Sequence, residues 1–440
     1  ARARVGAGAG SMTNLAASAG FDEWTQGRAL RSIGTNHGAT PLAFQHWHKF
    51  KEAFAPEIVH AAVERSGIPV ETVLDPFGGS GTTALASQFL GRHPVTSEVN
   101  PYLADVIEAK LQTYDAAELR ADLRSVIEAV SGSQSEKPYT GWGRLPPSFV
   151  EPGVDGRWIF SREVFAVIGC ALAAIDNLGS VSNRRLFRAV LGGCLVGVSN
   201  VIISGKGRRY RRNWQARQIQ RREAEGLIVG AWTGAVEDAL RLAGRASKTY
   251  DLRRGSSLKP GLQFGDFELA VFSPPYANSF DYTDVYNLEL WVLGYLRSAL
   301  DNRELRLATM SSHVQVHREY VGHASGVPVL DNLVEQLVAI RGSLWNKNIP
   351  EMVSQYFAEM RVLLRSLYAD CAARGQIWIV IGDSQYNGTV VPIAQILAEL
   401  ARVEGFEVVE RSVLRLMNAA PQQGGQKAIP ESLVVLHKSR

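Results

Sequence analysis

Apolar residues along this 440-residue chain recur with two different periods, and the alternation between the two periods predicts the order of its elements. Short runs of β-forming residues predict a strand that ends at Asp75 and further strands at His93–Glu98, Thr249–Leu252, Glu268–Phe272 and Gln376–Ile381. Helical spacing predicts helices at Thr82 to about Leu90, Tyr102 to about Leu111, about Asp284–Leu300, Met352–Ala373 and Val391–Glu404. Strands that alternate with helices in this order predict a parallel sheet with crossover helices.

Two parts of the chain depart from this alternation. A Gly-, Pro- and Ser-rich loop over residues 132–160 precedes a block in which we expect apolar helices at Arg162–Leu178 and Asn183–Ile203, a basic stretch at Lys206–Arg222 and a helix at about Glu223–Ala246. We expect this block to be an insertion. Near the C-terminus, strands at Phe406–Leu416 and Glu431–Lys438 predict an antiparallel hairpin that closes the sheet.

Composition narrows the class of protein. Hydrophobic residues make up 46% of the chain and charged residues 20%, which excludes a disordered chain. The most apolar stretches are shorter than a membrane span, so we expect no membrane contact. The three cysteines are far apart and no histidines have zinc-ligand spacing, so we expect no metal site and a cytoplasmic location. The first twelve residues lack the apolar centre of a signal peptide, and we expect them to be a flexible leader.

The string Asp75–Thr83 (DPFGGSGTT) joins a predicted strand to a predicted helix through a glycine-rich turn. Glycines let the backbone approach a ligand closely, and the helix N-terminus offers free N–H groups to an anion. The string lacks the lysine of a P-loop and the GxGxxG of a dinucleotide-binding turn. Asp75 suits a positively charged group, and Glu98, at the end of the next strand, can accept hydrogen bonds from ribose hydroxyls. A nucleoside, an amino cation and a carboxylate together describe S-adenosylmethionine (SAM).

A second string, Ser273-Pro274-Pro275-Tyr276, directly follows the strand at Glu268–Phe272. Its two prolines fix a rigid turn that lacks N–H donors. Tyr276 can stack on a planar base, while Ser273 Oγ and the Pro274 carbonyl can accept hydrogen bonds from an exocyclic amino group. Those bonds localise the amine lone pair on nitrogen, so that it can attack a sulfonium methyl. Alone, this string is more often a simple proline turn, but after an apolar strand and together with Asp75–Thr83 it indicates a catalytic site.

At these residues the sequence resembles the amino-group DNA methyltransferases, which methylate cytosine N4 or adenine N6. Asp75–Thr83 is similar to their cofactor motif I, Glu98 to the acidic residue of motif II, and Ser273–Tyr276 to catalytic motif IV. Gln45–Glu57 is similar to motif X, and Asp251–Ser256 is placed like motif III. The resemblance covers about 45–111 and 249–438. It implies an α/β fold of the SAM-dependent methyltransferase type, with a Rossmann-like, mostly parallel sheet, a C-terminal antiparallel hairpin and a helical insertion.

The same resemblance implies SAM as the cofactor. It implies that Ser273, Pro274, Pro275 and Tyr276 are catalytic. The cofactor-binding residues that it implies are Phe54, Asp75, Pro76, Phe77, Gly78, Gly79, Gly81, Thr82, Thr83, Glu98, Asn100, Asp251 and Ser256.

The expected substrate is the N4 amine of cytosine in double-stranded DNA, flipped out of the helix because the amine is otherwise paired. Serine before Pro-Pro-Tyr is typical of N4-cytosine enzymes, while adenine N6 remains the first alternative. An RNA base amine is a second alternative, although we find no RNA-binding appendage. A SAM-binding DNA module without activity is a third, and it predicts a degraded catalytic string, whereas all four residues are intact. The resemblance is compatible with a cognate restriction or defence partner and leaves the oligomeric state open.

The formal net charge of +4 conceals an uneven distribution. Lys206–Arg222 holds eight Lys and Arg and no Asp or Glu, and the remaining chain has 39 basic and 43 acidic residues, a net charge of −4. Arginine can clamp phosphates or recognise guanine, and an aromatic residue can stack at an extruded base. We therefore expect DNA contacts from Lys206, Arg208, Arg209, Tyr210, Arg211 and Arg212, with a solvated basic helix face as the alternative.

Five residues near or after the catalytic string have open roles. We expect Asn278, Asp281 and Tyr282 either to line the base pocket or to cap the following helix. We expect His313 and His317 to be surface or phosphate contacts rather than catalytic bases. The expected domain order is a leader at 1–40, the first part of the core at 41–130, the basic helical insertion at 131–248, the second part of the core at 249–300, a further insertion at 301–350, and the last part of the core at 351–440.

Overall fold

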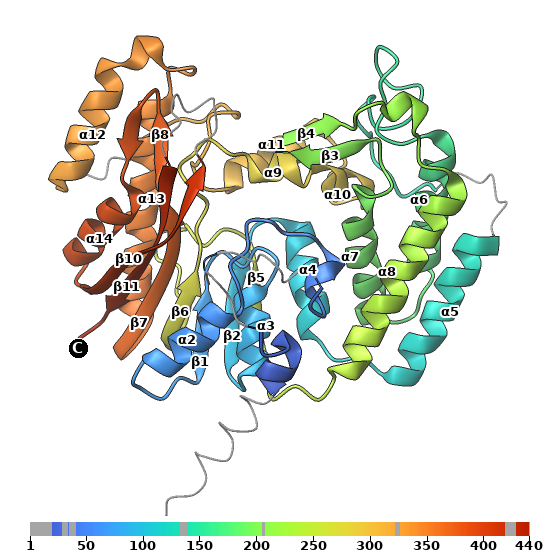
Figure 1. Ribbon diagram of the computed structural model, residues 1–440, viewed down its shortest axis with the longest axis horizontal. Helices are drawn as coiled ribbons and strands as arrows, with labels where there is room; N and C mark the ends of the chain where they lie inside the picture. Colours follow the sequence, from blue (N-terminus) through green and yellow to red (C-terminus); the bar gives the residue numbers. More distant parts are fainter. Residues whose placement is uncertain are drawn as a thin grey trace, which may run out of the picture.

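The sheet that organises the protein has seven strands in the order β10-β11-β7-β6-β1-β2-β5 (Figure 1). The computed structural model describes residues 20–28, 34, 41–132, 139–204, 207–321, 326–418 and 428–439. The strands are β1 (Thr72–Asp75), β2 (His93–Glu98), β5 (Asp251–Arg254), β6 (Phe267–Phe272), β7 (Cys371–Gly382), β10 (Glu407–Asn418) and β11 (Ala428–His437).

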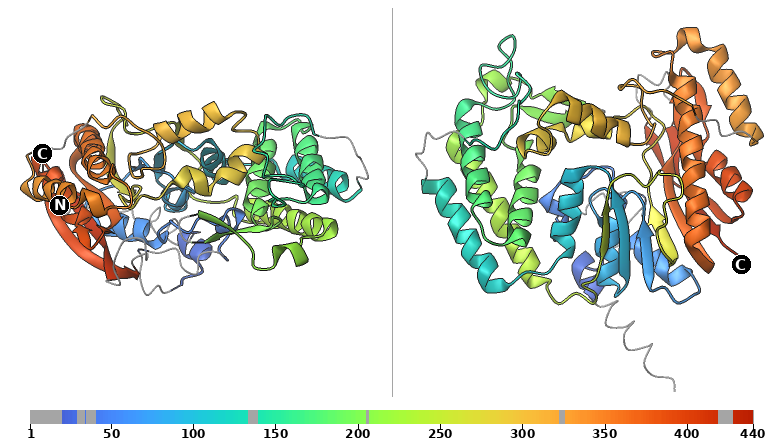
Figure 2. Two further views of the ribbon diagram at one scale, coloured as in Figure 1. Left: turned by 90° about the horizontal axis from the view of Figure 1, so that it is seen from above. Right: turned by 180° about the vertical axis from the view of Figure 1, so that it is seen from behind.

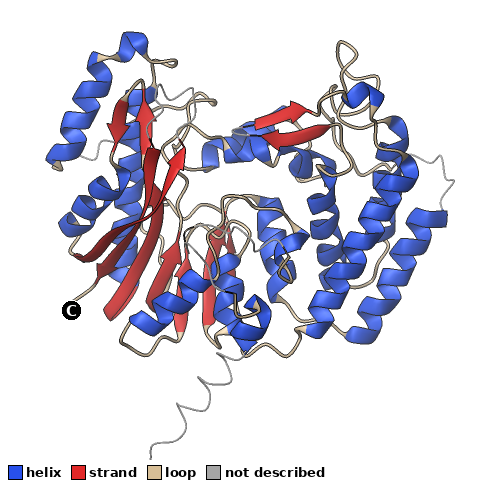
Figure 3. Cartoon of the chain, in the orientation of Figure 1, coloured by secondary structure: helices blue, strands red, loops and turns tan. Residues whose placement is uncertain are grey.

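Parallel pairing joins β5, β2, β1, β6 and β7, and β11 lies antiparallel between β7 and β10 (Figure 3). The predicted parallel sheet and the predicted C-terminal antiparallel hairpin are both confirmed. The strand order reverses at β1, because β2 and β5 follow on one side of it and β6 and β7 on the other. Such a reversal makes a topological switch point, where α/β sheets bind ligands.

Alternating side chains of the strands pack on opposite faces of the sheet. Val73 and Val271 face one core, together with helices α2 (Glu57–Arg65), α3 (Thr82–Phe89) and α4 (Pro101–Leu111). Leu74 and Phe272 face the other core, together with α13 (Ile349–Asp370) and α14 (Ile393–Val403). Every residue of α3 is buried, as expected for a crossover helix at the centre of the fold.

The predicted insertion forms a helical block beside the β5 edge of the sheet (Figures 1 and 2). The insertion supplies α6 (Arg162–Asp176), α7 (Val181–Leu195) and α8 (Arg221–Arg241), which pack on one another. Helix α5 (Ala116–Gly132), which the expected boundaries placed almost entirely in the core, packs on α6 and α8 and belongs to the same block. The helix expected to run to Ile203 is wrong at its end, because the chain turns after α7 and forms the hairpin of β3 (Val201–Ser204) and β4 (Gly207–Tyr210). Ser199 fixes this turn, since its hydroxyl donates to the carbonyl of Val196.

The segment after the catalytic string differs most from its prediction. Instead of one helix at Asp284–Leu300, the chain forms α9 (Tyr282–Val285), α10 (Asn287–Val292) and α11 (Ala299–Ala308). Gly294 has a φ of 82°, which ends the helical path after α10, and Ser298 starts α11 through a capping box with Asp301.

Several shorter elements complete the described part of the chain. A hairpin of β8 (Ser384–Tyr386) and β9 (Thr389–Val391) was not predicted, although its turn residues, Asn387 and Gly388, both have positive φ and form a typical hairpin signal. The others are α12 (Pro328–Ala339) and the 3-10 helices η1 (Gln45–Trp47), η2 (Trp214–Ala216) and η3 (Arg341–Ser343). None of the described helices is long and apolar enough to cross a membrane.

Residues 20–28 differ from the expectation of a leader that extends to residue 40. Phe21 and Trp24 are each 2% exposed and belong to the main core. The indole ring of Trp24 stacks on Phe89 of α3, and its N–H donates to the carbonyl of Ala43. This short segment is therefore part of the folded domain.

The glycine-rich turn after β1 generates a stability prediction. A Cβ atom on Gly78 would lie 2.6 Å from Thr96 Oγ1 and 2.8 Å from Ile107 Cδ1, so we expect Gly78→Ala to lower the free energy of unfolding by about 1–3 kcal/mol. Gly226 in α8 is exposed and has open space around its Cα, so Gly226→Ala is the control and should be neutral or stabilising by up to about 1 kcal/mol. Urea unfolding of both variants measures the difference, and equal effects would contradict the packing described.

Candidate active site

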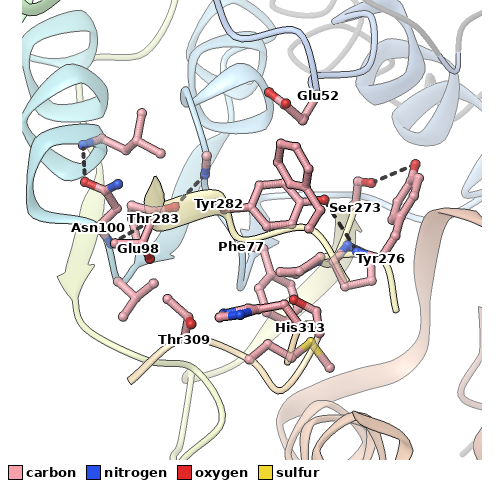
Figure 4. A pocket seen from close by; sticks show the side chains of 18 of the residues that line it. Glu52, Phe77, Glu98, Asn100, Ser273, Tyr276, Tyr282, Thr283, Thr309 and His313 are labelled. Atoms are coloured by element: carbon pink, nitrogen blue, oxygen red, sulfur yellow. Dashed lines mark hydrogen bonds between the residues drawn. The ribbon is translucent and has the colours of Figure 1, made fainter. Parts of the chain in front are cut away.

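A cavity of about 400 Å³ lies at the carboxyl ends of the five parallel strands. Each of these strands delivers a residue to its wall: Phe77 after β1, Glu98 from β2, Ser256 after β5, Ser273 after β6 and Asp383 after β7. Its volume is within the range of small-ligand sites. Figure 4 shows Glu98 and Asn100 on one side of this cavity and Ser273 and Tyr276 on the other.

The structure brings both sequence strings to this one cavity. The residues expected to bind cofactor that line it are Pro76, Phe77, Gly79, Glu98, Asn100 and Ser256. All four residues expected to be catalytic also line it, together with Asn278 and Tyr282. The remaining residues expected to bind cofactor or base lie outside its wall.

Hydrogen bonds from buried residues hold the Asp75–Thr83 loop in place at the cavity. Asp75 is buried and its Oδ1 accepts a hydrogen bond from the Phe77 N–H at 2.9 Å. The Thr83 hydroxyl donates to the carbonyl of Val271 in β6 at 3.0 Å, and Lys110 Nζ donates to the carbonyl of Ser80 at 2.7 Å. Gly78, Gly81 and Thr82 are likewise enclosed within the turn. These residues hold the loop in its conformation but do not line the cavity, whereas Pro76, Phe77 and Gly79 of the same loop do.

Glu98 is the buried acid of the cavity. Its two carboxylate oxygens accept hydrogen bonds from the backbone N–H groups of Gly79 and Asn100, each at 2.7 Å. Burial raises the pKa of Glu98 to about 7, and the pKa of Asp75 to about 7, although the backbone hydrogen bonds act in the opposite direction. Each carboxylate oxygen has a second lone pair, so Glu98 can also accept hydrogen bonds from a ligand.

Tyr276 is held by a charged pair on the C-terminal strands. Its hydroxyl donates to Glu431 Oε1 at 3.0 Å, and Arg415 forms a two-point salt bridge with the same carboxylate. Its ring packs against Gly382, where a Cβ atom would lie 2.7 Å from the ring. Burial and Glu431 raise the pKa of Tyr276 well above its ordinary value, so the phenol stays protonated and its ring faces are fixed.

The Gln45–Glu57 segment contributes a different residue from the one expected. Phe54 is 6% exposed and packs in the main core, away from the cavity wall. Its neighbours Phe50, Lys51, Glu52 and Ala53 line the cavity instead. Glu52 Oε2 accepts a hydrogen bond from the Tyr286 hydroxyl at 2.9 Å, and burial raises the pKa of Glu52.

Asp251 and Asp281 also lie outside the cavity wall. Asp251 begins β5, at the end of the sheet opposite the cavity, and its carboxylate is 3.5 Å from His93 Nε2. Asp281 caps α9, since its Oδ1 accepts hydrogen bonds from the N–H groups of Thr283 and Asp284. Of the two roles considered for Asp281, its contacts are those of a helix cap. Asp251 lies at the start of β5, whereas the cavity lies at the other end of that strand.

The expectation that His313 lies at the surface is wrong. Its side chain is 1% exposed and lines the cavity, whereas His317 is exposed. Nothing in the sequence around His313 distinguished it from a surface residue, because its burial depends on packing against the loop after the catalytic string. Among the described residues, no group of His, Cys, Asp and Glu could hold a metal ion.

The first part of the basic stretch forms the hairpin strand β4 rather than a helix face, and α8 begins only at Arg221. Arg211 donates to the carbonyls of Val196 and Gly197 at 2.8 and 3.0 Å, and the Arg208 guanidinium lies 5.6 Å from the centre of the Phe149 ring. Arg209 and Arg212 are exposed, and Tyr210 is partly buried. Lys206 lies outside the described residues. β4 packs against α9, the helix that follows the catalytic string.

Comparison with known proteins shows similarity to DNA methyltransferases in sequence. Residues 23–109 match the model of the N6/N4 DNA methylase family, described as DNA methylase. The chain is 24% identical to the type II methyltransferase M.BsoBI of Geobacillus stearothermophilus, over 90% of this chain and 86% of that protein. It is 25% identical to the type II methyltransferase M.AvaI of Nostoc sp. strain PCC 7120, over 89% and 86% of the two chains.

A solved rRNA methyltransferase, AviRa from Streptomyces viridochromogenes, aligns with 12% identity and a TM-score of 0.29, over 88% of this chain and 86% of that chain.

The residues that match the DNA methylase model include the glycine-rich turn and Glu98. The chain is thus similar to the N6/N4 amino-group DNA methylases over residues 23–109, and over most of its length it is a distant homologue of two type II methyltransferases.

The buried acids predict how stability depends on pH. Because the folded-state pKa of Glu98 is about 7, above its ordinary value of 4.5, the folded protein binds more protons than the unfolded chain between these values. The free energy of unfolding should therefore fall as the pH rises from about 4.5 to about 7, by up to about 1.4 kcal/mol per pH unit. Glu98→Gln should make this dependence less steep, and Asp75, whose pKa is also raised to about 7, should maintain the remaining slope.

Urea unfolding between pH 4.5 and 8 measures the slope. Glu128→Gln, at an exposed position on α5, is the matched control and should keep the wild-type slope. An unchanged slope in Glu98→Gln would show that the Glu98 carboxyl titrates normally in the folded protein.

Proposed function

We propose that the protein transfers a methyl group from SAM to the N4 amine of cytosine in double-stranded DNA, as the methyltransferase of a restriction-modification system. The observation that carries this proposal is the single cavity that joins the Asp75–Thr83 loop and Glu98 to the Ser273–Tyr276 string. The match to the N6/N4 DNA methylase family supports methylation of a base amine, and the two type II relatives support the restriction-modification setting.

The chemistry of the cavity fits SAM. Bound SAM supplies an electrophilic methyl group on a positively charged sulfur. Glu98 offers a buried carboxylate that can accept hydrogen bonds from ribose hydroxyls, and the Phe77 side chain offers an apolar surface for the adenine. Glu98 and Glu52 also give the cavity a negative character when ionised, which suits the cationic end of the molecule.

Activation of the amine depends on two hydrogen-bond acceptors in the catalytic string. Ser273 Oγ and the Pro274 carbonyl can each accept one N–H of the amine, which localises its lone pair on nitrogen. The Tyr276 ring, held by Glu431 and packed against Gly382, can stack on the base and keep the amine in line with the methyl group. The proton then leaves to water, since serine is a weak base at neutral pH.

Base flipping requires a protein surface that holds the distorted duplex. The β3–β4 hairpin supports this role, because it packs against α9 and carries exposed Arg209, with exposed Arg212 in the turn that follows β4. Arg208 and Arg211 are already engaged with protein groups, so among the arginines at and directly after β4 we assign phosphate contact to Arg209 and Arg212.

Adenine N6 is the alternative target, since adenine offers the same amino group to the same acceptors. The serine of the catalytic string favours cytosine. Mass spectrometry of nucleosides distinguishes N4-methylcytosine from N6-methyladenine directly.

Replacement of the catalytic serine tests the reaction. With tritiated SAM and unmethylated duplex DNA, we expect wild-type protein to produce N4-methylcytosine and Ser273→Ala to lose turnover by about a hundredfold while SAM affinity, measured by calorimetry, changes little. Ser125→Ala, at an exposed serine of α5, is the matched control and should be fully active. Methyl transfer only to RNA would contradict the proposed substrate, and normal turnover of Ser273→Ala would remove this serine from the reaction.

Replacement of the two exposed hairpin arginines tests the DNA surface. Each phosphate contact contributes about −0.9 to the slope of log affinity against log salt, so the double variant Arg209→Ala/Arg212→Ala should bind DNA more weakly, with a slope that is less steep by about 2. Arg120→Ala/Arg124→Ala, at exposed positions of α5, is the control with the same change in net charge. Fluorescence anisotropy at several salt concentrations measures the slopes, and equal slopes in the two double variants would exclude the hairpin.

A further inference from the structure

The segment Thr309–His313 forms one wall of the cavity and is tied to the loop that follows the catalytic string. The N–H of Ser279 donates to the carbonyl of Ser312 at 2.9 Å, and the Gln315 amide donates to the carbonyl of Ser279 at 2.9 Å. Ser311 anchors the segment to α13, because its N–H and its hydroxyl both donate to Glu359, at 2.8 and 2.6 Å. The position of this wall is therefore fixed relative to the Ser273–Tyr276 string.

His313 is the exceptional side chain in this wall. It is 1% exposed, and neither ring nitrogen has a hydrogen-bond partner among the described residues. The nearest carboxylate oxygen, Asp281 Oδ1, is 3.9 Å from Nε2, and Asp281 is itself paired with Arg306. A buried polar group without a partner is costly, so an imidazole that faces a cavity in this state indicates a ligand that completes its hydrogen bonds. Figure 4 shows the imidazole in the cavity.

The charge state of His313 defines what it can bind. Burial lowers the pKa of His313 to about 4, with Arg318 and Arg306 acting in the same direction and Asp281 and the nearby Gln315 side chain against it. At neutral pH the ring is uncharged and offers one N–H donor and one nitrogen acceptor. Such a group suits a neutral heterocycle better than a phosphate.

The hydrogen-bonding needs of a cytosine in this cavity match that group. The acceptors Ser273 Oγ and Pro274 carbonyl use the two N–H groups of the amine, which leaves the ring nitrogen N3 and the carbonyl O2 in need of a donor. The Tyr276 hydroxyl is committed to Glu431. An imidazole N–H is a donor of the required kind.

We propose that His313 contacts the flipped base and donates a hydrogen bond to its acceptor edge, so that it acts as a specificity-determining residue for the base. The proposal rests on the proposed function, because it requires a base in this cavity. Its effect is orientation: a base held at both its amine and its acceptor edge cannot rotate in its plane away from the methyl group.

Two variants of His313 separate hydrogen bonding from packing. His313→Leu keeps an apolar side chain of similar bulk, while His313→Asn keeps an N–H donor at a similar reach. With tritiated SAM and unmethylated plasmid DNA, we expect kcat/KM of His313→Leu to fall by about tenfold or more and His313→Asn to recover part of that loss. SAM affinity by calorimetry should stay within about twofold for both variants, as expected for a residue that touches the base rather than the cofactor.

Thermal unfolding and a control on the same segment complete the test. His313→Leu should unfold at the same temperature as wild type or higher, because it removes a buried polar group that has no partner. His317→Leu changes an exposed histidine four residues after His313 and should keep wild-type kinetics. A lower unfolding temperature of His313→Leu, or a loss of SAM affinity, would overturn the base contact.

The outcomes for the two proposals can be told apart. A wild-type protein that methylates no DNA overturns the proposed function, and the role of His313 fails with it. Active wild-type protein together with unchanged kinetics of His313→Leu overturns the role of His313 alone. Equal losses in His313→Leu and His313→Asn would show that no hydrogen-bond donor is required at this position.

Discussion

The parallel pairing of β1 with β6 is the constraint on which the rest of this protein depends. Because Leu74 pairs with Ala270, both strands end at the same edge of the sheet, and the glycine-rich loop and the catalytic string leave the sheet side by side. The bond from the Thr83 hydroxyl to the Val271 carbonyl fixes α3 to the same edge. Two strings that lie far apart in the sequence thereby line one cavity, which is where we propose that cofactor and base meet. For the transfer of a group between two ligands, holding the ligands close together contributes more than any single side chain does.

Buried charge maintains the cavity. Glu98, Asp75 and Lys110 are enclosed around the first loop, and burial moves the pKa of each to about 7. On the opposite side, Arg415 and Glu431 fix the hydroxyl of Tyr276. Such groups are expensive to bury unless they are hydrogen-bonded, and backbone N–H and carbonyl groups satisfy most of them here. The cost is consistent with a site that holds polar ligands in a fixed orientation.

The insertion carries the positive charge that the near-neutral total conceals. Without Lys206–Arg222 the chain has a net charge of −4, so an acidic core is combined with a basic hairpin. Only part of that charge is free to contact a partner molecule, since Arg211 is bound to the end of α7 and Arg208 lies over Phe149. Exposed Arg209 lies on the hairpin that packs against α9, and exposed Arg212 follows directly after it.

The sequence by itself determined the sheet, its parallel and antiparallel parts and the two strings at its edge, because these depend on local periodicity and on glycine and proline at fixed places. It also contains the turn signal Asn387-Gly388 of the β8–β9 hairpin. Only the tertiary structure decided which residues face the cavity. Glu52 replaces Phe54 because the chain after η1 turns Phe54 into the core, and Asp251 is excluded because it begins its strand rather than ending it. His313 and Glu431 reach the cavity through long-range packing against the loop after β6 and through the pairing of β11 with β7, and no local pattern encodes either contact.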